Sequence, residues 1–433
     1  MAERLLRGRL LSFARKPEGP GDAGALDHEA DGGLILRGGR IAAAGDFAAM
    51  RAEAPEAEVI DHRPHLILPG FIDPHIHFPQ LQVVASWGAE LLDWLERYTF
   101  PAEAAFADPA HARAMAGPFL DRLVEHGTTT AAVYCSAHAT SAEALFEEAA
   151  RRDMRLVAGK VMMDRNCPEG VRDTAQAGYD DSAALIARWH GRGRLGYAIS
   201  PRFSVTSSAG QLAAAGALAA EHPGCHRQTH IAENHAEIAA VARLFPEARD
   251  YLDTYDRAGL LGPRMLLGHC LHLSDREVAR IAETGSRAVF CPTSNLFLGS
   301  GLFDRRGLEG AGVTTAIATD IGGGTSWSML DTLAEGYKVL ALRGERLHPF
   351  EAFDWATRGN AEAMGLSDRI GRLAPGYEAD LVVLDARATP AMRLRMDRAE
   401  TLAEELFVLQ VMGGRDAVAA TYVAGRRPET AEG

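Results

Sequence analysis

Short apolar runs alternate with amphipathic stretches along the middle of the chain. The runs are rich in Val, Ile, Leu, Ala and Thr, which is typical of strands that are buried on both faces. The stretches between most of them, such as 110–125 and 209–221, have apolar residues at helical spacing. We predict eight strands, at residues 66–73, 128–134, 155–161, 195–200, 225–230, 265–269, 288–291 and 315–319. Eight strands that alternate with helices favour an α/β fold, a parallel sheet closed into a (β/α)8 TIM-type barrel.

The two ends of the chain have a different pattern, in which short β-like runs are separated by Gly and Pro. Near the N-terminus we predict a strand at 4–14, a glycine-rich loop at 19–33 and a hairpin over 34–44. After residue 376 the pattern of strands and turns returns, at 379–386 and 418–424. We therefore expect both ends to form one small β-sandwich domain beside the barrel. The predicted boundaries divide the chain into residues 1–65, 66–375 and 376–433.

The composition is that of an ordinary globular protein, and it narrows the possible partners. The 433 residues suffice for a barrel and an accessory domain, with 47% of them hydrophobic and 24% charged. The net charge of −13 argues against a nucleic-acid partner, and no apolar run approaches the ~20 residues of a membrane span. The five cysteines are scattered without a C-x-x-C pair, so we expect no disulfide framework and a reducing, cytoplasmic location.

Metal-binding residue types occur where four of the predicted strands end. His75 and His77 close the first strand, and side chains two apart on a strand point to the same face. His230, His269 and Asp320 end the predicted fifth, sixth and eighth strands. Each of these residues, taken singly, could be structural. Because the carboxyl ends of barrel strands meet at one mouth, we expect all five side chains to converge there.

Three neutral imidazoles, one carboxylate and a water molecule satisfy a catalytic zinc site. Glu233 follows His230 by three residues, so it could accept a proton from the activated water and hand it to a substrate nitrogen. His269 could orient that water or supply a further ligand, and the residues leave both roles open.

Several segments resemble the amidohydrolase superfamily, and more narrowly its mononuclear metal-dependent deaminase branch. The first of them reads PGFIDPHIHFPQ, and the second reads LLDWLERYTFPAE. Together the segments that carry the resemblance are 69–80, 91–103, 201–204, 229–233, 268–270, 291–303, 319–324 and 374–384. The resemblance thus extends over nearly the whole chain.

The resemblance implies one Zn²⁺ ion per chain, with iron as a less favoured substitute. The implied zinc ligands are His75, His77, His230 and Asp320. Glu233 would then be the proton shuttle, while His269 and Asp320 would hold the zinc-bound water in line for attack. It also implies a homodimer.

In binuclear barrels that resemble this one, a modified lysine at the end of the fourth strand bridges two metal ions. No lysine ends the predicted fourth strand at 195–200, so the resemblance favours one metal ion, and we expect Lys160 to pack in the barrel or pair with a carboxylate.

The resemblance further implies a purine substrate, held at its edge by Gln80 and Arg202 and on its face by Phe203. A planar guanidinium suits a carbonyl edge, and an aromatic ring suits stacking. The implied activity is hydrolytic deamination of guanine to xanthine and ammonia. Alternatives are another ring, such as 8-oxoguanine, a different aminopurine, a pterin or a triazine, and a barrel without catalysis that acts as a scaffold. We expect the long aromatic segment 78–107 to close over the substrate.

Overall fold

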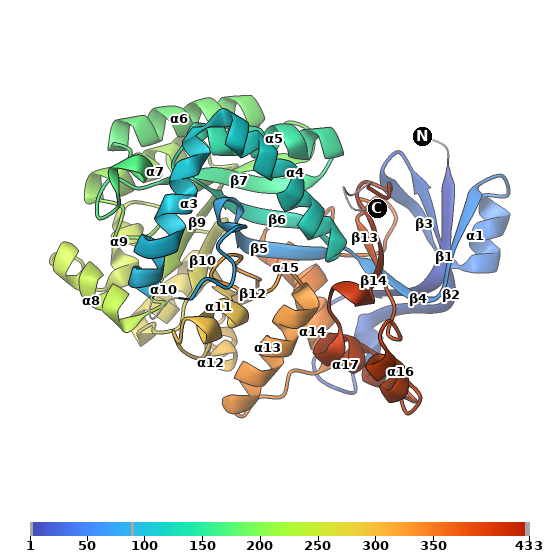
Figure 1. The fold of residues 1–433 in the computed structure, drawn as a ribbon. Coiled ribbons are helices and arrows are strands. Elements are labelled where there is room, and N and C mark those ends of the chain that lie inside the picture. Colours follow the sequence, from blue (N-terminus) through green and yellow to red (C-terminus); the bar gives the residue numbers. More distant parts are fainter. Residues whose placement is uncertain (1–2, 88–90, 429–433) are drawn as a thin grey trace.

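The computed structural model describes residues 3–87 and 91–428, and its larger part is a barrel of eight parallel strands. Each strand pairs with the next one in the chain, so the order of the strands around the barrel, from β5 to β12, follows the sequence (Figure 1). The strands are β5 (Phe71–His77), β6 (Thr128–Cys135), β7 (Arg155–Met162), β8 (Leu195–Pro201), β9 (His226–Ile231), β10 (Met265–His269), β11 (Arg287–Phe290) and β12 (Thr314–Ile317). The predicted (β/α)8 fold is therefore confirmed.

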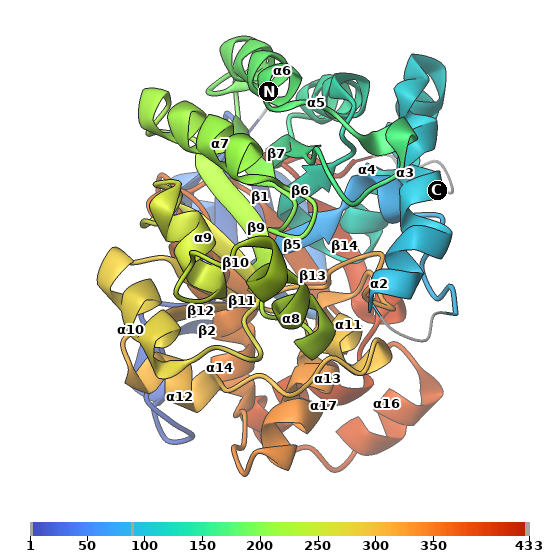
Figure 2. The same cartoon turned by 90° about the vertical axis from the view of Figure 1, so that its left-hand side faces the viewer.

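Helices cover the outside of the barrel and its mouth (Figure 2). Those that follow or precede barrel strands are α4 (Pro109–Glu125), α5 (Ala139–Arg152), α6 (Ala175–Trp189), α7 (Ala209–Glu221), α8 (His235–Leu244), α9 (Tyr251–Arg257), α10 (Asp275–Thr284), α11 (Pro292–Phe297), α12 (Arg305–Gly310), α13 (Met329–Leu342), α14 (Pro349–Asp354) and α15 (Asn360–Ala363). Two short helices, α2 (Leu91–Trp94) and α3 (Phe100–Ala104), follow β5. Among the described residues, no helix is both long and apolar enough to span a bilayer.

The seam between the first and last barrel strands is closed by a few specific hydrogen bonds. The backbone N–H of Asp320 donates to the carbonyl of His75 at 3.0 Å, and that of His77 donates to Ile321 at 2.6 Å. The buried Asn360 side chain bridges the same seam lower down, since its Nδ2 donates to the carbonyls of Ile72 and Ile317 at 2.7 and 2.8 Å. Its Oδ1 accepts from the N–H of Ile317 at 3.0 Å. The seam thus brings the ends of β5 and β12 together.

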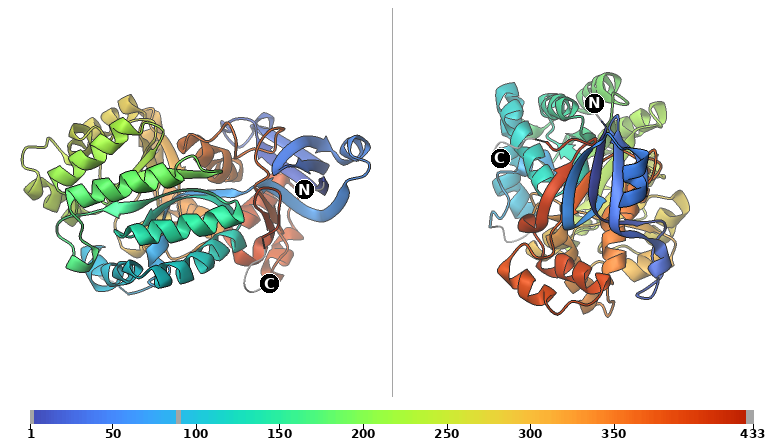
Figure 3. Two further views of the ribbon diagram at one scale, coloured as in Figure 1. Left: turned by 90° about the horizontal axis from the view of Figure 1, so that it is seen from above. Right: turned by 90° about the vertical axis from the view of Figure 1, so that its right-hand side faces the viewer.

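The terminal segments form one six-stranded mixed sheet in the order β14-β13-β4-β1-β2-β3. Its strands are β1 (Arg4–Phe13), β2 (Leu26–Arg37), β3 (Arg40–Asp46), β4 (Glu58–Pro69), β13 (Leu381–Leu384) and β14 (Val418–Tyr422). β4 lies parallel to β1 and antiparallel to β13, and so joins the two ends of the chain. Figure 3 shows this sheet at one end of the barrel, and Figure 1 shows β1 and β14 together on that side.

Three local predictions differ from the structure. The boundary proposed at residue 66 falls within β4, because the apolar run continues through both sheets and only Gly70 separates β4 from β5. The predicted loop at 19–33 is wrong for residues 26–33, which extend β2 as an exposed antiparallel arm against β1. The last segment also contains two helices, α16 (Pro390–Met396) and α17 (Leu402–Met412). The capping box Thr401-x-x-Glu404 before α17 was a readable signal of a helix start.

One further helix, α1 (Phe47–Glu53), follows β3.

Candidate metal and substrate site

The predicted metal ligands meet at the carboxyl ends of the strands, at the end of the barrel away from the small sheet. Asp320 Oδ1 lies 3.4 Å from the Nε2 atoms of both His75 and His77. His77 Nε2 lies 3.1 Å from His230 Nε2. The ligand atoms of His75, His77 and His230 all lie within 4.8 Å of one another. The four side chains therefore surround one small space.

The donor atoms in this space fit a divalent metal ion. Both ring nitrogens of His75 and Nδ1 of His77 are buried without a hydrogen-bond partner among the described residues. His230 Nδ1 lies 2.7 Å from the carbonyl oxygen of Arg202, to which it donates, and this leaves Nε2 with a lone pair toward the other imidazoles. Buried polar atoms are ordinarily paired, so the unpaired Nε2 of His75, which faces Asp320, points to an ion as its missing partner.

Burial keeps His77, His230 and His269 neutral, as metal ligation requires of an imidazole. It lowers the pKa of His77 and of His230 well below the ordinary value, and it lowers the pKa of His269 to about 3. Burial alone would raise the pKa of the Asp320 carboxyl, but its interactions with His75, His269 and His77 together outweigh that effect and keep the pKa below its usual range. The site thus offers neutral nitrogen donors and one ionised carboxylate.

Cys291, which the sequence did not suggest, is a further group near the ligands. It follows β11, and its Sγ lies within 4.8 Å of ligand atoms of His75, His269 and Asp320. Burial raises the pKa of the Cys291 thiol well above its usual value. Because the thiolate is the form that binds metals, a thiol held in its protonated form is disfavoured as a ligand.

Glu233 and His269 face each other beside the ligands. Glu233 Oε2 lies 3.4 Å from His269 Nε2, and Ser300 Oγ donates to Glu233 Oε1 at 3.1 Å. Asn295 Nδ2 lies 2.9 Å from His269 Nδ1. An amide nitrogen only donates, so Nδ1 accepts, and the neutral imidazole carries its proton on Nε2, toward Glu233. Burial raises the pKa of Glu233 well above its ordinary value.

The backbone at these strand ends adopts conformations that non-glycine residues rarely take. Ala232, His269, Cys270 and Asp320 have φ values of 50°, 72°, 54° and 53°. Such left-handed residues cost energy and gather at functional sites, where the surrounding structure holds them. Gly268 has a related role, since a Cβ there would lie 2.4 Å from His75 Cε1. The imidazole of His75 therefore packs directly on the backbone of β10.

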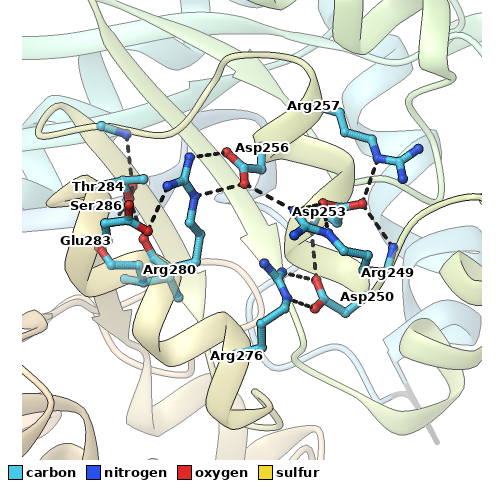
Figure 4. Close-up of polar contacts among 12 residues, drawn as sticks. Arg249, Asp250, Asp253, Asp256, Arg257, Arg276, Arg280, Glu283, Thr284 and Ser286 are labelled. Carbon is cyan, nitrogen blue, oxygen red and sulfur yellow. Dashed lines mark hydrogen bonds and ion pairs between the residues drawn. The ribbon is translucent and has the colours of Figure 1, made fainter.

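Helix α9 holds the backbone of His230 through a hydrogen bond. Tyr255 on α9 donates its hydroxyl proton to the carbonyl of His230 at 2.9 Å. The helix is in turn joined to α10 by ion pairs of Asp250 with Arg276 and of Asp256 with Arg280 (Figure 4). The position of this metal-site carbonyl therefore depends on the packing of a second helix.

A cavity opens over the ligands. Its wall includes His77, His230, His269, Glu233 and Asp320, together with all three predicted substrate residues, Gln80, Arg202 and Phe203. Leu91, Trp94 and Leu95 also line it, so the segment 78–107 contributes to the wall. Whether this segment closes over a substrate stays a prediction.

Sequence reasoning missed several groups that contact the predicted site residues. Glu103, Asn295 and Ser300 lie inside segments quoted for the resemblance, but no local pattern gave them a role. Glu237 had a readable signal, the capping box with Asn234, and its Oε2 also accepts from the N–H of Glu233 at 2.9 Å. The prediction for Lys160 is confirmed, because its buried ammonium lies 2.7 Å from Asp173.

The comparisons with known proteins agree with this geometry. The family model described as the amidohydrolase family matches residues 66–427. Guanine deaminase of Escherichia coli strain K12 is 45% identical over 97% of this chain and 96% of that protein. The solved structure of E. coli guanine deaminase superposes with a TM-score of 0.96, covering 99% of this chain and 100% of that one, at 44% identity. A guanine deaminase structure from C. acetobutylicum with bound guanine in the active site has a TM-score of 0.89 at 27% identity, with 99% and 100% coverage.

Proposed function

The chain belongs to the amidohydrolase family, and we propose that it catalyses the hydrolytic deamination of guanine to xanthine and ammonia. The observation that carries the proposal is the convergence of two groups of side chains on one cavity. His77, His230, Asp320 and Glu233 line one part of it, with His75 packed against them, and Gln80, Arg202 and Phe203 line the rest. Relatives that span nearly the whole chain and are named for this activity support the choice of guanine.

The donor set suits a single zinc ion. His75, His77 and His230 supply imidazole nitrogens and Asp320 supplies a carboxylate, which are ligands that zinc prefers in catalytic sites. When bound, the ion acts as a Lewis acid that makes hydroxide available near neutral pH. His269 completes this arrangement as a neighbour of the water, because the Nδ1 contact from Asn295 leaves its Nε2 as a donor.

The pocket wall holds the purine with its C2 atom toward the ligands. Arg202 donates to acceptors on the purine edge, Gln80 hydrogen-bonds the same edge, and Phe203 packs near its face. Most of the side chains that line the cavity are themselves buried.

Glu233 moves the protons. It accepts one from the attacking water and delivers it to N3 of the ring while the C2–O bond forms. The same carboxylate then passes the remaining proton of that water from the C2 hydroxyl to the amino nitrogen, and collapse breaks the bond between C2 and this nitrogen, which leaves as ammonia. One water molecule is consumed, and xanthine is the other product. Burial raises the pKa of Glu233 and so makes its carboxyl a stronger base than an exposed one.

Ammonia release from guanine, with the metal content measured on the same sample, tests the proposal. We expect turnover of guanine, about one zinc ion per chain, loss of activity on chelation and recovery with Zn²⁺. A panel of 8-oxoguanine, aminopurines, pterins and triazines tests the alternative rings. A protein that holds metal but releases ammonia faster from one of those rings would overturn the assignment of guanine.

Two further parts of the proposal concern the protein in the cell. All five cysteines are buried and unpaired in the structure, which supports a reducing compartment such as the cytoplasm. We also propose a homodimer, and light scattering on the purified protein measures its mass.

A further inference from the structure

Glu103 is a buried carboxylate that contacts both predicted purine-edge residues. It lies on α3, and its side chain is 1% exposed. Arg202 Nη1 donates to its two oxygens at 2.6 and 2.8 Å. Gln80 Nε2 donates to Oε1 of the same carboxylate at 3.0 Å. One acidic side chain therefore joins two residues that come from different strand ends.

The charge of Arg202 needs a partner at this place. Its side chain is only 3% exposed, and among the described residues Glu103 is the one acid paired with it. Removing a carboxylate and a guanidinium from water is costly, and a buried pair adds little to stability compared with apolar residues. A buried pair of which one member, Arg202, lines the cavity is therefore better explained by what it positions than by the stability of the fold.

The contacts leave one side of the guanidinium for a ligand. Glu103 engages Nη1 alone, and within the described part of the chain no hydrogen bond leaves Nε or Nη2 of Arg202. The ring of Phe100 lies 5.5 Å from the guanidinium carbon. Arg202 is thus held by a carboxylate and an aromatic ring while its remaining donors stay available.

Glu103 also decides which way the amide of Gln80 points. Gln80 Nε2 faces the carboxylate, and its Oε1 accepts from the N–H of Gly322 at 3.3 Å. Exchanging the two ends of the amide would bring an oxygen against the carboxylate and a nitrogen against an N–H group, and neither pair can bond. The donor and acceptor of Gln80 are therefore fixed in one arrangement.

We propose that Glu103 is a positioning residue that sets the preference for purines with an oxygen at C6. It holds the donors of Arg202 and the amide of Gln80 in one orientation. In that orientation their hydrogen-bonding groups are complementary to the carbonyl edge of guanine. A hydrogen-bonding site built this way rejects ligands that lack the matching group, because its buried donors are then left unpaired. The inference rests on the proposed function and adds the origin of its specificity.

Competitive inhibition of guanine turnover tests the inference with two ligands that differ at C6. Hypoxanthine has the C6 oxygen and purine lacks it, and neither carries the amino group that is removed. For Glu103→Gln we expect the inhibition constant of hypoxanthine to rise about tenfold or more and that of purine to change less than about twofold. The KM for guanine should rise more than kcat falls, because the change affects binding at the far edge of the ring.

Two control variants separate positioning from folding. Glu96→Gln removes the same charge from an exposed site in the same segment, and it should leave both inhibition constants unchanged. Glu103→Asp keeps the carboxylate, so it should recover part of the hypoxanthine affinity even where Glu103→Gln folds poorly. An equal rise in both inhibition constants, or an unchanged inhibition constant for hypoxanthine, would overturn the inference. Neither result would affect the evidence for the deaminase activity. A wild-type protein inactive on guanine would overturn the proposed function first, and this inference with it.

Discussion

The carboxyl group of Glu233 is held by neighbours from distant parts of the chain. Ser300 donates to one oxygen, His269 faces the other at 3.4 Å, and Glu237 accepts from the backbone N–H of Glu233. The side chain is therefore aimed at the cavity before any ligand binds, and pre-organisation of this kind is what proton transfer requires.

Replacing Glu233 with Gln should separate chemistry from metal binding. Glutamine keeps the shape and can still accept from Ser300, but it cannot take a proton, so we expect turnover to fall by about 10²- to 10⁴-fold. The metal content should not change, because the four proposed ligands are intact. Ammonia release and elemental analysis measure the two effects, with the exposed Glu169→Gln as control. Near-normal turnover in Glu233→Gln would rule out the shuttle role.

At the scale of elements, α9 links the site to the outer helices. Asp253 on α9 is fully buried and pairs with Arg249 and Arg257, the latter at 2.7 Å. Burial alone would raise the pKa of Asp253, but the hydrogen bonds from Arg249 outweigh it and lower the pKa to about 2. These ion pairs form part of the network in Figure 4 and hold the helix that carries Tyr255.

Asp253 should make the stability of the fold depend on pH in the acid range. Its native pKa lies below the unfolded value of ~3.9, so its contribution is present above pH ~4 and is lost as the pH falls toward ~2. We expect Asp253→Asn to lower the free energy of unfolding by about 1 kcal/mol at pH 6, a modest value because both arginines are about half exposed. Urea unfolding at pH 6 and pH 3, with the exposed Glu56→Gln as control, measures the difference. A deficit that does not shrink at pH 3 would contradict this linkage.

The seam between β5 and β12 depends on Asn360. Asn360→Ala leaves two carbonyls and one N–H buried without their partner, so we expect a loss of about 3 kcal/mol or more in unfolding free energy. The exposed Gln176→Ala on α6 should stay within about 0.5 kcal/mol of wild type. The seam also sets the distance between the ends of β5 and β12. Metal affinity should therefore fall in Asn360→Ala and stay unchanged in the control Gln176→Ala. Thermal unfolding and zinc titration check both expectations.

At the scale of the whole molecule, buried ion pairs join the barrel to the small sheet. Arg155 Nε on β7 donates to Glu378 Oε2 at 2.7 Å, and Arg194 Nη2 lies 2.6 Å from Asp380 Oδ2. These residues lie at the opposite end of the barrel from the cavity. These ion pairs therefore stabilise the barrel and the small sheet together, and they do so without contact with the cavity.

Glu378→Ala should destabilise the protein without changing its catalysis. The variant leaves Arg155 buried without its carboxylate, and removing one partner of a buried pair costs about 3–5 kcal/mol. Glu335→Ala breaks an exposed pair with Lys338 and should cost less than about 1 kcal/mol. Thermal unfolding compares the two, and guanine turnover well below the unfolding temperature should match wild type. A large fall in turnover there would mean that the two ends of the barrel communicate.

The barrel strands and the predicted ligands could be read from the sequence because both have local patterns. A run of apolar residues predicts a buried strand. In a barrel of parallel strands, a polar residue at the carboxyl end of such a run lies at the mouth, so its position follows from the local sequence. His75, His77, His230, His269 and Asp320 were found in this way, and the structure brings them together. The terminal helices α16 and α17 had caps that could have been read but were not.

The partners of these residues were decided only by the tertiary structure. Glu103 meets Arg202 across 99 positions of sequence, and Asn360 meets Ile72 across 288. A buried carboxylate or amide finds its partner through the packing of whole elements, so nothing in its own neighbourhood predicts the contact. The amino-acid sequence by itself determined which chemistry is present at the strand ends. The closed barrel determined which buried groups position the functional side chains at the strand ends. Only closure of the barrel brings residues from distant strands within hydrogen-bonding distance.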